Sequence, residues 1–513
     1  MSEPSWVDVR RGLYRDSITL MQISRGLAER DGVLDALTAM ATDLNLELLG
    51  QMGFTAPPDV GPNDLVVAIR AADQAALAAA RDLLDSMLDR AAAHLAGTAS
   101  GTPGGASLGA PGGMPGGGLA ASARTIAAAA ARVRGPGPAA TLALISVPGR
   151  HAFVEAMDAL ESGLNVMIFS DNVPVEQEIL LKDAAARLGL IVMGPDCGTA
   201  VVGGAGVGFA NAVRPGPVGI VAASGTGSQQ VMCLLDAAGV GVSHAIGVGG
   251  RDLSAEVSGR ATLQALAALN ADPATELIIV VSKPPAPPVA ALIREAARRL
   301  TTPIVFAVLG DEAELPPPGG RAAADLTTAV ETALTALDVP VPDWPSWPAA
   351  VPRRPRRGEL RGLFAGGTLC AEALFIAADA LGTVHSNLPG WPAGDTGHVM
   401  IDFGDDRLTE GRAHPMIDPS LRLDRLAAAL ADPGCAVVLL DVVLGHAAEP
   451  DPAARLAPLI AESGDTAVVV SLCGTPHDPQ GRDRQAAALR DAGAAVFASN
   501  AAAARHAVSL VEA

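Results

Sequence analysis

The chain has 513 residues, which is enough for three or four compact units, each with its own core. Hydrophobic residues make up 49% of it but aromatic residues only 3%, and its 56 glycines and 39 prolines favour an α/β protein with short strands and many tight turns. Acidic residues outnumber basic ones 55 to 36, and the net charge of -19 disfavours nucleic acid and membrane surfaces as partners.

The number and spacing of the cysteines indicate the cellular compartment. All five are widely spaced and none belongs to a C-x-x-C pair, so we expect neither a disulfide framework nor a zinc site. No apolar run reaches the roughly 20 residues that a bilayer-spanning helix needs. We therefore expect a cytoplasmic protein with reduced thiols.

Composition divides the first quarter of the chain into a module and a linker. Residues 1–95 combine strand-like runs with a long helix rich in Ala and Leu, which predicts a small α+β module similar to a ferredoxin-like fold. Residues 96–123 are rich in Gly, Pro and Ser and cannot bury enough apolar surface to order themselves. We expect this segment to be a flexible linker.

Residues 124–213 alternate short apolar strands with helical segments. Such spacing predicts right-handed βαβ crossovers and a parallel sheet. The absence of G-x-G-x-x-G argues against a dinucleotide site. Residues 147–150 and 193–200 instead follow strands at the carboxyl edge of the sheet, where open α/β sheets bind ligands.

Two longer segments, 214–340 and 360–513, repeat the same succession of motifs. The sequence GIVAASGTG (219–227) in the first corresponds to GLFAGGTLC (362–370) in the second. A connection rich in Pro and Arg, at 341–359, joins the two. This pattern predicts an internal duplication.

Each repeat places a small, polar turn between a strand and a helix. The first amides of a helix have no internal partner and the helix dipole adds partial positive charge, so such a turn can hold an anion. If the repeats face each other, their helix N-termini could converge on one phosphate; alternatively, Ser and Thr merely cap the helices. The predicted phosphate-binding residues are Ser224, Gly225, Thr226, Gly227 and Ser228, then Gly366, Gly367 and Thr368, and Gly445 in a third such turn.

Three charged or titratable side chains are candidate catalytic residues. Arg251 and Lys283 could orient a carboxylate or a phosphate, and a surface ion pair is the alternative for Arg251. His446 could act in acid–base or nucleophilic chemistry, although a core histidine is the commoner outcome. The candidate substrate- or cofactor-binding residues are Asp196, Cys197, Gly198, Gly249, Gly250, Asp402, Gly404 and His414. Carboxylates in the last of these loops could surround a divalent cation, but solvated carboxylates are commoner and no metal is predicted.

Four segments combine small residues with polar ones in a specific order: GPDCGTA (194–200), GPVGIVAASGTGSQQV (216–231), SHAIGVGGRDLS (243–254) and DFGDDRLTEGRAHPMIDP (402–419). Together they resemble the FdrA family, which is similar to the succinyl-CoA synthetase (acyl-CoA synthetase) superfamily. The resemblance implies a CoA-binding-like Rossmann domain at 124–213. It also implies two flavodoxin-like ligase domains, at 214–340 and 360–513, similar to those of the synthetase α and β subunits.

The chain departs from the synthetases in two ways. They bear a phosphorylated histidine after the last strand of the α ligase domain, but residues 305–320 here contain no histidine. In addition, no segment of the chain resembles the ATP-grasp domain of the synthetases. The resemblance therefore implies a carbamoyltransferase subunit, similar to the oxamate carbamoyltransferase of allantoin degradation, with carbamoyl phosphate as substrate and an amide as acceptor.

Two alternatives stay open. The chain could be an acyl-CoA synthetase component, similar to succinate–CoA ligase, whose ATP-grasp part is a separate partner. It could also be a non-catalytic regulatory protein that binds acyl-CoA or phosphate. The resemblance implies other protein subunits in a hetero-oligomer, with a homodimer as a further candidate; no cofactor is assigned, although CoA is a candidate.

Overall fold

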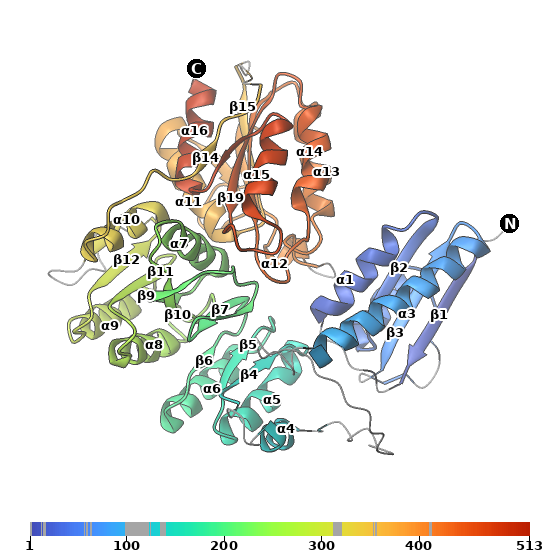
Figure 1. The fold of residues 1–513 in the computed structure, drawn as a ribbon, viewed down its shortest axis with the longest axis horizontal. Helices are drawn as coiled ribbons and strands as arrows, with labels where there is room; N and C mark the ends of the chain where they lie inside the picture. The colour runs from blue at the N-terminus through green and yellow to red at the C-terminus, as the bar shows by residue number, and fades with distance from the viewer. Residues whose placement is uncertain are drawn as a thin grey trace, which may run out of the picture. The chain divides into compact units, whose positions relative to one another are not determined.

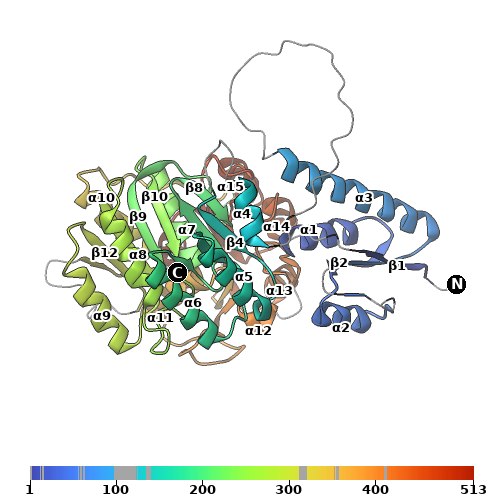
Figure 2. The ribbon, with the colours of Figure 1, turned by 90° about the horizontal axis from the view of Figure 1, so that it is seen from below.

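The computed structural model describes residues 3–11, 13, 17–55, 57, 60–61, 64–97, 123, 125–133, 140–310, 321–351, 353, 357–409 and 413–512. The chain divides into two compact units, Met1–Ala129 and Ala130–Ala513 (Figures 1 and 2). Helix α4 (Ile126–Val133) contains the boundary between them. Among the described helices, none is both long enough and apolar enough to cross a membrane.

The first unit is an antiparallel sheet with helices on both faces. It consists of β1 (Ser5–Arg10), α1 (Ser17–Ala28), β2 (Val33–Met40), α2 (Asp43–Gln51), β3 (Leu65–Ala71) and α3 (Gln74–Gly97), with the strand order β1-β3-β2. Side chains alternate along the central strand. Leu65, Val67 and Ile69 therefore join the core that α1 and α3 cover, whereas Val66 and Ala68 join a second core with Leu49 of α2.

Most of the elements expected in this unit are present, but β1 was not predicted. Asp8 and Arg10 interrupt its apolar run, so the segment lacks a clear strand pattern. The ferredoxin-like assignment stays a prediction for the three strands described. Residues 98–122 of the predicted linker lie outside the described residues, and α3 extends to Gly97.

The smallest sheet of the second unit is parallel, with the order β4-β5-β6. Its elements are β4 (Leu142–Ile145), α5 (Gly149–Glu161), β5 (Asn165–Ile168), α6 (Val175–Leu188) and β6 (Val192–Met193). The predicted strand–helix alternation is therefore present. The next hairpin, β7 (Thr199–Val202) and β8 (Ala205–Gly208), joins the following sheet instead, because Val201 pairs with Ala245. The small sheet thus ends before residue 199, and the hairpin covers an edge of the next sheet.

Two seven-stranded sheets form the rest of the unit, with the orders β13-β12-β11-β9-β10-β7-β8 and β14-β20-β19-β18-β15-β17-β16. The first is built from β9 (Pro215–Ala222), α7 (Gly225–Ala237), β10 (Val242–Gly247), α8 (Arg260–Ala271), β11 (Leu277–Ser282), α9 (Pro287–Ala297), β12 (Ile304–Val308), β13 (Arg321–Ala323) and α10 (Leu326–Ala336). The second is built from β14 (Ser346–Trp347), β15 (Glu359–Phe364), α11 (Gly367–Leu381), β16 (Val384–Ser386), β17 (His398–Asp402), α12 (Asp406–Thr409), α13 (Ser420–Ala431), β18 (Cys435–Val443), α14 (Pro452–Ala461), β19 (Ala467–Cys473), α15 (Arg482–Asp491), β20 (Ala495–Phe497) and α16 (Asn500–Glu512).

The two large sheets share a core arrangement. The orders β12-β11-β9-β10 and β19-β18-β15-β17 are equivalent, and all neighbours in them are parallel. An internal duplication would produce this correspondence. The first helices of the two repeats, α7 and α11, contact each other. The prediction of an α/β protein with parallel sheets is confirmed, and the contact between α7 and α11 determines the geometry of the site.

Candidate functional site

The two predicted polar turns meet in the structure. Ser224 caps α7, because its Oγ accepts a 3.0 Å hydrogen bond from the amide of Gly227. The same Oγ lies 2.5 Å from Oγ1 of Thr368, in the first turn of α11. The N-terminus of a helix from each repeat is therefore held at one point by a hydrogen bond between the repeats.

Glycine is required on both sides of this contact. A Cβ atom on Gly227 would lie 2.9 Å from Cγ2 of Thr368, and one on Gly366 would lie 2.7 Å from Oγ1 of Thr226. Both distances are shorter than normal contacts between side chains. The Gly-rich composition of the turns thus permits the close approach of α7 and α11.

Several amides at the two helix ends are free. In α7, the N–H groups of Gly225 and Thr226 have no hydrogen-bond acceptor among the described residues. In α11, the same holds for Gly367, Thr368 and Leu369. These groups carry the positive ends of two helix dipoles, so the junction has the chemistry of an oxyanion site.

Besides the amide of Gly227, which donates to Ser224, groups of two further predicted phosphate-binding residues are bonded within the protein. The hydroxyl of Ser228 is buried and donates to the carbonyl of Gly225 at 2.7 Å, so it points back to its own helix. The amide of Gly366 donates to Oδ2 of Asp441 at 2.8 Å, and the neighbouring amide of Ala365 donates to Oδ1 at 2.7 Å. The prediction that Ser228 and Gly366 donate to a phosphate is therefore wrong for these atoms.

The third predicted turn, at Gly445, offers no free amide. Its N–H donates to Gln480 Oε1 at 3.2 Å, and the amide of His446 donates to the carbonyl of Ala210 at 3.0 Å. No helix follows directly, since α14 begins only at Pro452. The prediction of a phosphate-binding helix N-terminus at Gly445 is wrong. The side chain of His446 is exposed beside this turn.

Asp402 ends β17 beside the N-terminus of α11. Its Oδ1 accepts a 2.9 Å hydrogen bond from the amide of Gly404. Its Oδ2 would lie 2.5 Å from a Cβ atom on Gly367, so a side chain at that position would collide with the carboxylate. Burial raises the pKa of Asp402 to about 7, against the opposing effects of the Gly404 amide and of Lys283.

Lys283 and His414 lie near this carboxylate. Lys283 directly follows β11; its side chain is exposed and makes no hydrogen bond or ion pair with a described residue. His414 accepts a 3.2 Å hydrogen bond at Nδ1 from the amide of Met416, and its Nε2 lies 2.8 Å from the Cβ position of Gly404. Burial, assisted by Arg422, lowers the pKa of His414 to about 4, so its ring is neutral at physiological pH.

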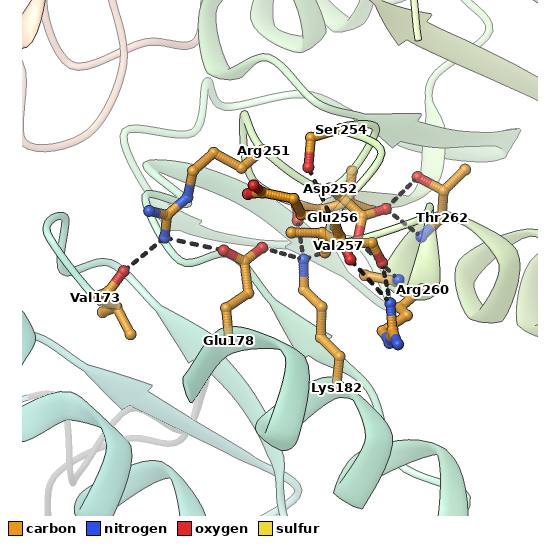
Figure 3. Close-up of polar contacts among 12 residues, drawn as sticks. Val173, Glu178, Lys182, Arg251, Asp252, Ser254, Glu256, Val257, Arg260 and Thr262 are labelled. Carbon is orange, nitrogen blue, oxygen red and sulfur yellow. Dashed lines mark hydrogen bonds and ion pairs between the residues drawn. The ribbon is translucent and has the colours of Figure 1, made fainter. Parts of the chain in front are cut away.

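Arg251 does not face this junction as a free cation. Its guanidinium forms a 2.9 Å ion pair with Oε2 of Glu178 and donates to the carbonyl of Val173 at 2.7 Å (Figure 3). The ion-pair alternative is thus the correct one, although Glu178 is buried rather than on the surface. Arg251 connects the small sheet with the first large sheet and is not available as the predicted catalytic clamp.

The residues predicted to bind a substrate or cofactor near the small sheet have different environments. Cys197 is buried, and burial raises the pKa of its thiol to about 12, so the thiol is not a nucleophile at neutral pH. Asp196 is exposed and has a positive φ of 57°. The carbonyl of Gly198 accepts from Phe209 at 2.8 Å. Gly249 approaches the carbonyl of Pro195, whereas a Cβ atom on Gly250 would meet open space.

The described residues contain no cluster of three His, Cys, Asp or Glu side chains that could hold a metal ion. Asp405, in the loop after β17, forms a 2.8 Å ion pair with Arg407 instead. Sequence reasoning missed Asp441 and its buried partner Arg422, whose Nη1 lies 2.6 Å from Oδ1. The only available signal was an aspartate inside an otherwise apolar strand, LLDVV.

Comparison with known proteins defines the class first. Residues 363–510 match the CoA-ligase family and residues 1–103 match the family described as AllF, heavy metal-associated domain. Residues covering 36% of the chain are 27% identical to α subunits of ADP-forming succinate–CoA ligases from Trichomonas vaginalis and Aquifex aeolicus. The chain spans 59% of the length of each of these two relatives. The second unit therefore includes a CoA-ligase domain.

The chain belongs to the family of YahF, an uncharacterised protein of Escherichia coli strain K12, with 36% identity over 522 aligned positions and 96% of both chains covered. A solved acetyl-coenzyme A synthetase from Ca. Korarchaeum cryptofilum has a TM-score of 0.33 and 18% identity, covering 76% of this chain and 87% of its own. The comparisons support the CoA-ligase alternative and give no support to a carbamoyltransferase.

The heavy metal implied by the name of the N-terminal family does not fit the residues present. The first cysteine of the chain is Cys197, so residues 1–103 lack the thiolates that bind soft heavy metals. No metal cluster occurs among the described residues of this unit either. The match therefore describes the family of the domain, and we derive no metal chemistry from it.

Proposed function

We propose that the chain is a component of an acyl-CoA synthetase, and that it binds an acyl phosphate where α7 and α11 meet. The observation that carries this proposal is the 2.5 Å contact between Ser224 Oγ and Thr368 Oγ1, which brings two helix N-termini to one point. Two helix dipoles and their free amides favour a multiply charged oxyanion. The match of residues 363–510 to the CoA-ligase family supports acyl-group chemistry for that anion.

In this proposal the groups around the junction have distinct roles. The free amides of Gly225, Gly367 and Thr368 bind phosphoryl oxygens and stabilise the charge that develops on the departing phosphate. Lys283 supplies an exposed positive charge that makes no hydrogen bond or ion pair with a described residue and acts on Asp402 through electrostatic attraction alone. Thr368 and Ser224 position the two helices relative to each other.

We place CoA at the carboxyl edge of the small sheet. Open α/β sheets bind ligands at this edge, in the loops that follow the strands. Asp196 and Gly250 lie in exposed loops there, and the space beside Gly250 is open. Arg251 acts as a positioning residue in this proposal, because its contacts with Glu178 and Val173 fix the loop that contains Gly250.

The ATP-dependent step belongs to a separate partner chain in this proposal. Residues 305–320 contain no histidine that could be phosphorylated at the place where the synthetases carry theirs. The partner then supplies an ATP-grasp domain and delivers the activated acyl group. His446 is exposed and is the candidate phosphoryl acceptor of this chain.

The missing histidine also favours a second candidate. An enzyme that receives a pre-formed acyl phosphate needs no phosphorylated residue, since proximity and electrostatic stabilisation lower the barrier directly. Carbamoyl phosphate, with an amide such as oxamate as acceptor, is the substrate that the FdrA resemblance implies. The two candidates share the anion site at α7 and α11 and differ in whether CoA binds.

Equilibrium dialysis of the purified chain with radiolabelled CoA, acetyl phosphate and carbamoyl phosphate separates the candidates. We expect CoA and an acyl phosphate to bind together, and Lys283→Ala to weaken acyl phosphate binding about tenfold, because a charged hydrogen bond is lost. Arg299→Ala is the matched control: it removes an exposed cation just after the C-terminus of α9, paired with Glu295 at 2.9 Å, and should change nothing.

Binding of carbamoyl phosphate without any binding of CoA would favour the second candidate. An acyl phosphate affinity that is the same in wild type and in Lys283→Ala would contradict the role of Lys283. Failure of every anion to bind would contradict the site itself.

A further inference from the structure

Asp402 presents an unpaired oxygen to the junction of α7 and α11. The residue is 7% exposed, and its Oδ1 accepts the amide of Gly404. No described residue donates to Oδ2, which faces Gly367 at the N-terminus of α11. This carboxylate oxygen and several amides without partners among the described residues thus lie side by side at the N-terminus of α11, where a bound anion would meet both.

The charge of Asp402 would oppose an anion at this position. An ionised carboxylate beside the first turn of α11 neutralises the field of the helix end and of Lys283, whereas a protonated carboxyl can donate a hydrogen bond to a phosphoryl oxygen. The ligand and the ionised carboxylate therefore compete for the same positive groups. Only one protonation state of Asp402 is compatible with a tightly bound anion.

We propose that anion binding at the junction of α7 and α11 is coupled to uptake of one proton by Asp402, which then donates a hydrogen bond from Oδ2 to the ligand. This inference rests on the proposed function and states how pH regulates it. Binding of the phosphorylated substrate weakens as the pH rises. The protonated carboxyl also leaves Lys283 free to bind the ligand instead of balancing Asp402.

The neighbours of Asp402 support proton uptake near neutral pH. Burial raises the pKa of Asp402 to about 7, with smaller effects from the Gly404 amide, Lys283, Asp441 and Asp405. Asp441 is paired with Arg422, and Asp405 with Arg407. Cys370, on α11, has a pKa raised well above its usual value, chiefly by burial, and stays neutral.

Sulfate is the probe that isolates this effect, because it stays doubly charged between pH 6 and pH 9 while phosphate titrates. We expect the dissociation constant of sulfate, measured by equilibrium dialysis with labelled sulfate, to rise about tenfold per pH unit above pH 7 in the wild-type chain. Asp402→Asn keeps the Oδ1 acceptor and adds a permanent donor, so its sulfate affinity should be independent of pH. Asp379→Asn, which removes an exposed carboxylate from the last turn of α11, should keep the wild-type slope.

A second measurement does not depend on a folded variant. Calorimetric titration of the wild-type chain with sulfate at pH 8, in buffers of different ionisation enthalpy, should report the uptake of about one proton per anion bound. Sulfate binding with no proton uptake, or an unchanged slope in Asp402→Asn, overturns the role of Asp402 but leaves the anion site intact. No sulfate binding at pH 6 in any variant overturns the anion site and this inference together.

Discussion

Replacing Lys182 with methionine should lower the free energy of unfolding by about 3–5 kcal/mol, because it removes the cation from a buried ionic network. The Nζ atom of Lys182 lies 2.7 Å from Glu178 Oε1, 2.8 Å from Asp252 Oδ1 and 3.0 Å from the carbonyl of Val248 (Figure 3). All three charged side chains are at most 1% exposed. Methionine fills the space of the lysine side chain. It leaves the carboxylates of Glu178 and Asp252 buried without the positive charge of Lys182.

The network also fixes local structure. Asp252 accepts hydrogen bonds from the amides of Ala261 and Thr262 at 3.0 and 2.9 Å, so it holds the N-terminus of α8 (Figure 3). Loss of Lys182 should therefore loosen the contact between α6 and α8 as well as the loop at residues 248–252. Urea denaturation followed by circular dichroism measures the change in the unfolding free energy.

Asp183→Ala provides the matched control for Lys182. It removes a neighbouring ion pair of α6, with Arg260 at 2.8 Å, in which both side chains are 31–43% exposed. Solvent screening limits such a pair to about 1 kcal/mol or less. A Lys182→Met variant no less stable than Asp183→Ala would show that the buried network does not stabilise the fold.

Replacing Asp441 with asparagine should have a comparable effect and should also disrupt the anion site. Asp441 accepts the amides of Ala365 and Gly366 and the guanidinium of Arg422, and neither charged side chain is more than 8% exposed. Asparagine replaces one carboxylate oxygen by an NH2 group, which would face the N–H groups that donate to Asp441 in the wild type. Arg422 also loses its counter-charge. We expect a loss of about 3–5 kcal/mol in the unfolding free energy.

The functional consequence follows from the position of Asp441. The two amides that it holds directly precede α11, so they set the direction of the helix end that meets Ser224. Sulfate binding by folded Asp441→Asn should fall at least tenfold. The control is Asp432→Asn, whose carboxylate is 39% exposed and lies 3.3 Å from Arg361; it should bind sulfate as the wild type does. Unchanged sulfate binding in Asp441→Asn would contradict its role in shaping the site.

The polar turns could be predicted because their signal is local. A β-branched, apolar run that stops at small polar residues and continues as a helix indicates a strand, a turn and a helix N-terminus within ten residues or so. The contact between Ser224 and Thr368 could not be predicted from a local signal, since 144 residues separate them. The repeat made a shared site conceivable, but only the packing of α7 against α11 provides it.

The errors arose where long-range partners decide the role of a residue. Gly445 lies in a turn similar to the other two, yet Gln480 takes its amide and no helix begins there. Lys182 and Glu178 were not singled out, because their i,i+4 spacing on a helix does not distinguish an exposed pair from a buried one. Their burial results from α8 and the loop that contains Asp252, which lie some 70 residues further along the chain.

The central claim is that the N-termini of α7 and α11 form one oxyanion site. A crystal of the full chain soaked with tungstate, an oxyanion with strong anomalous scattering, tests it most directly. We predict an anomalous peak at this junction, with tungstate oxygens within hydrogen-bonding distance of the amides of Gly225 and Gly367. A tungstate peak elsewhere, with none at this junction, would contradict the account.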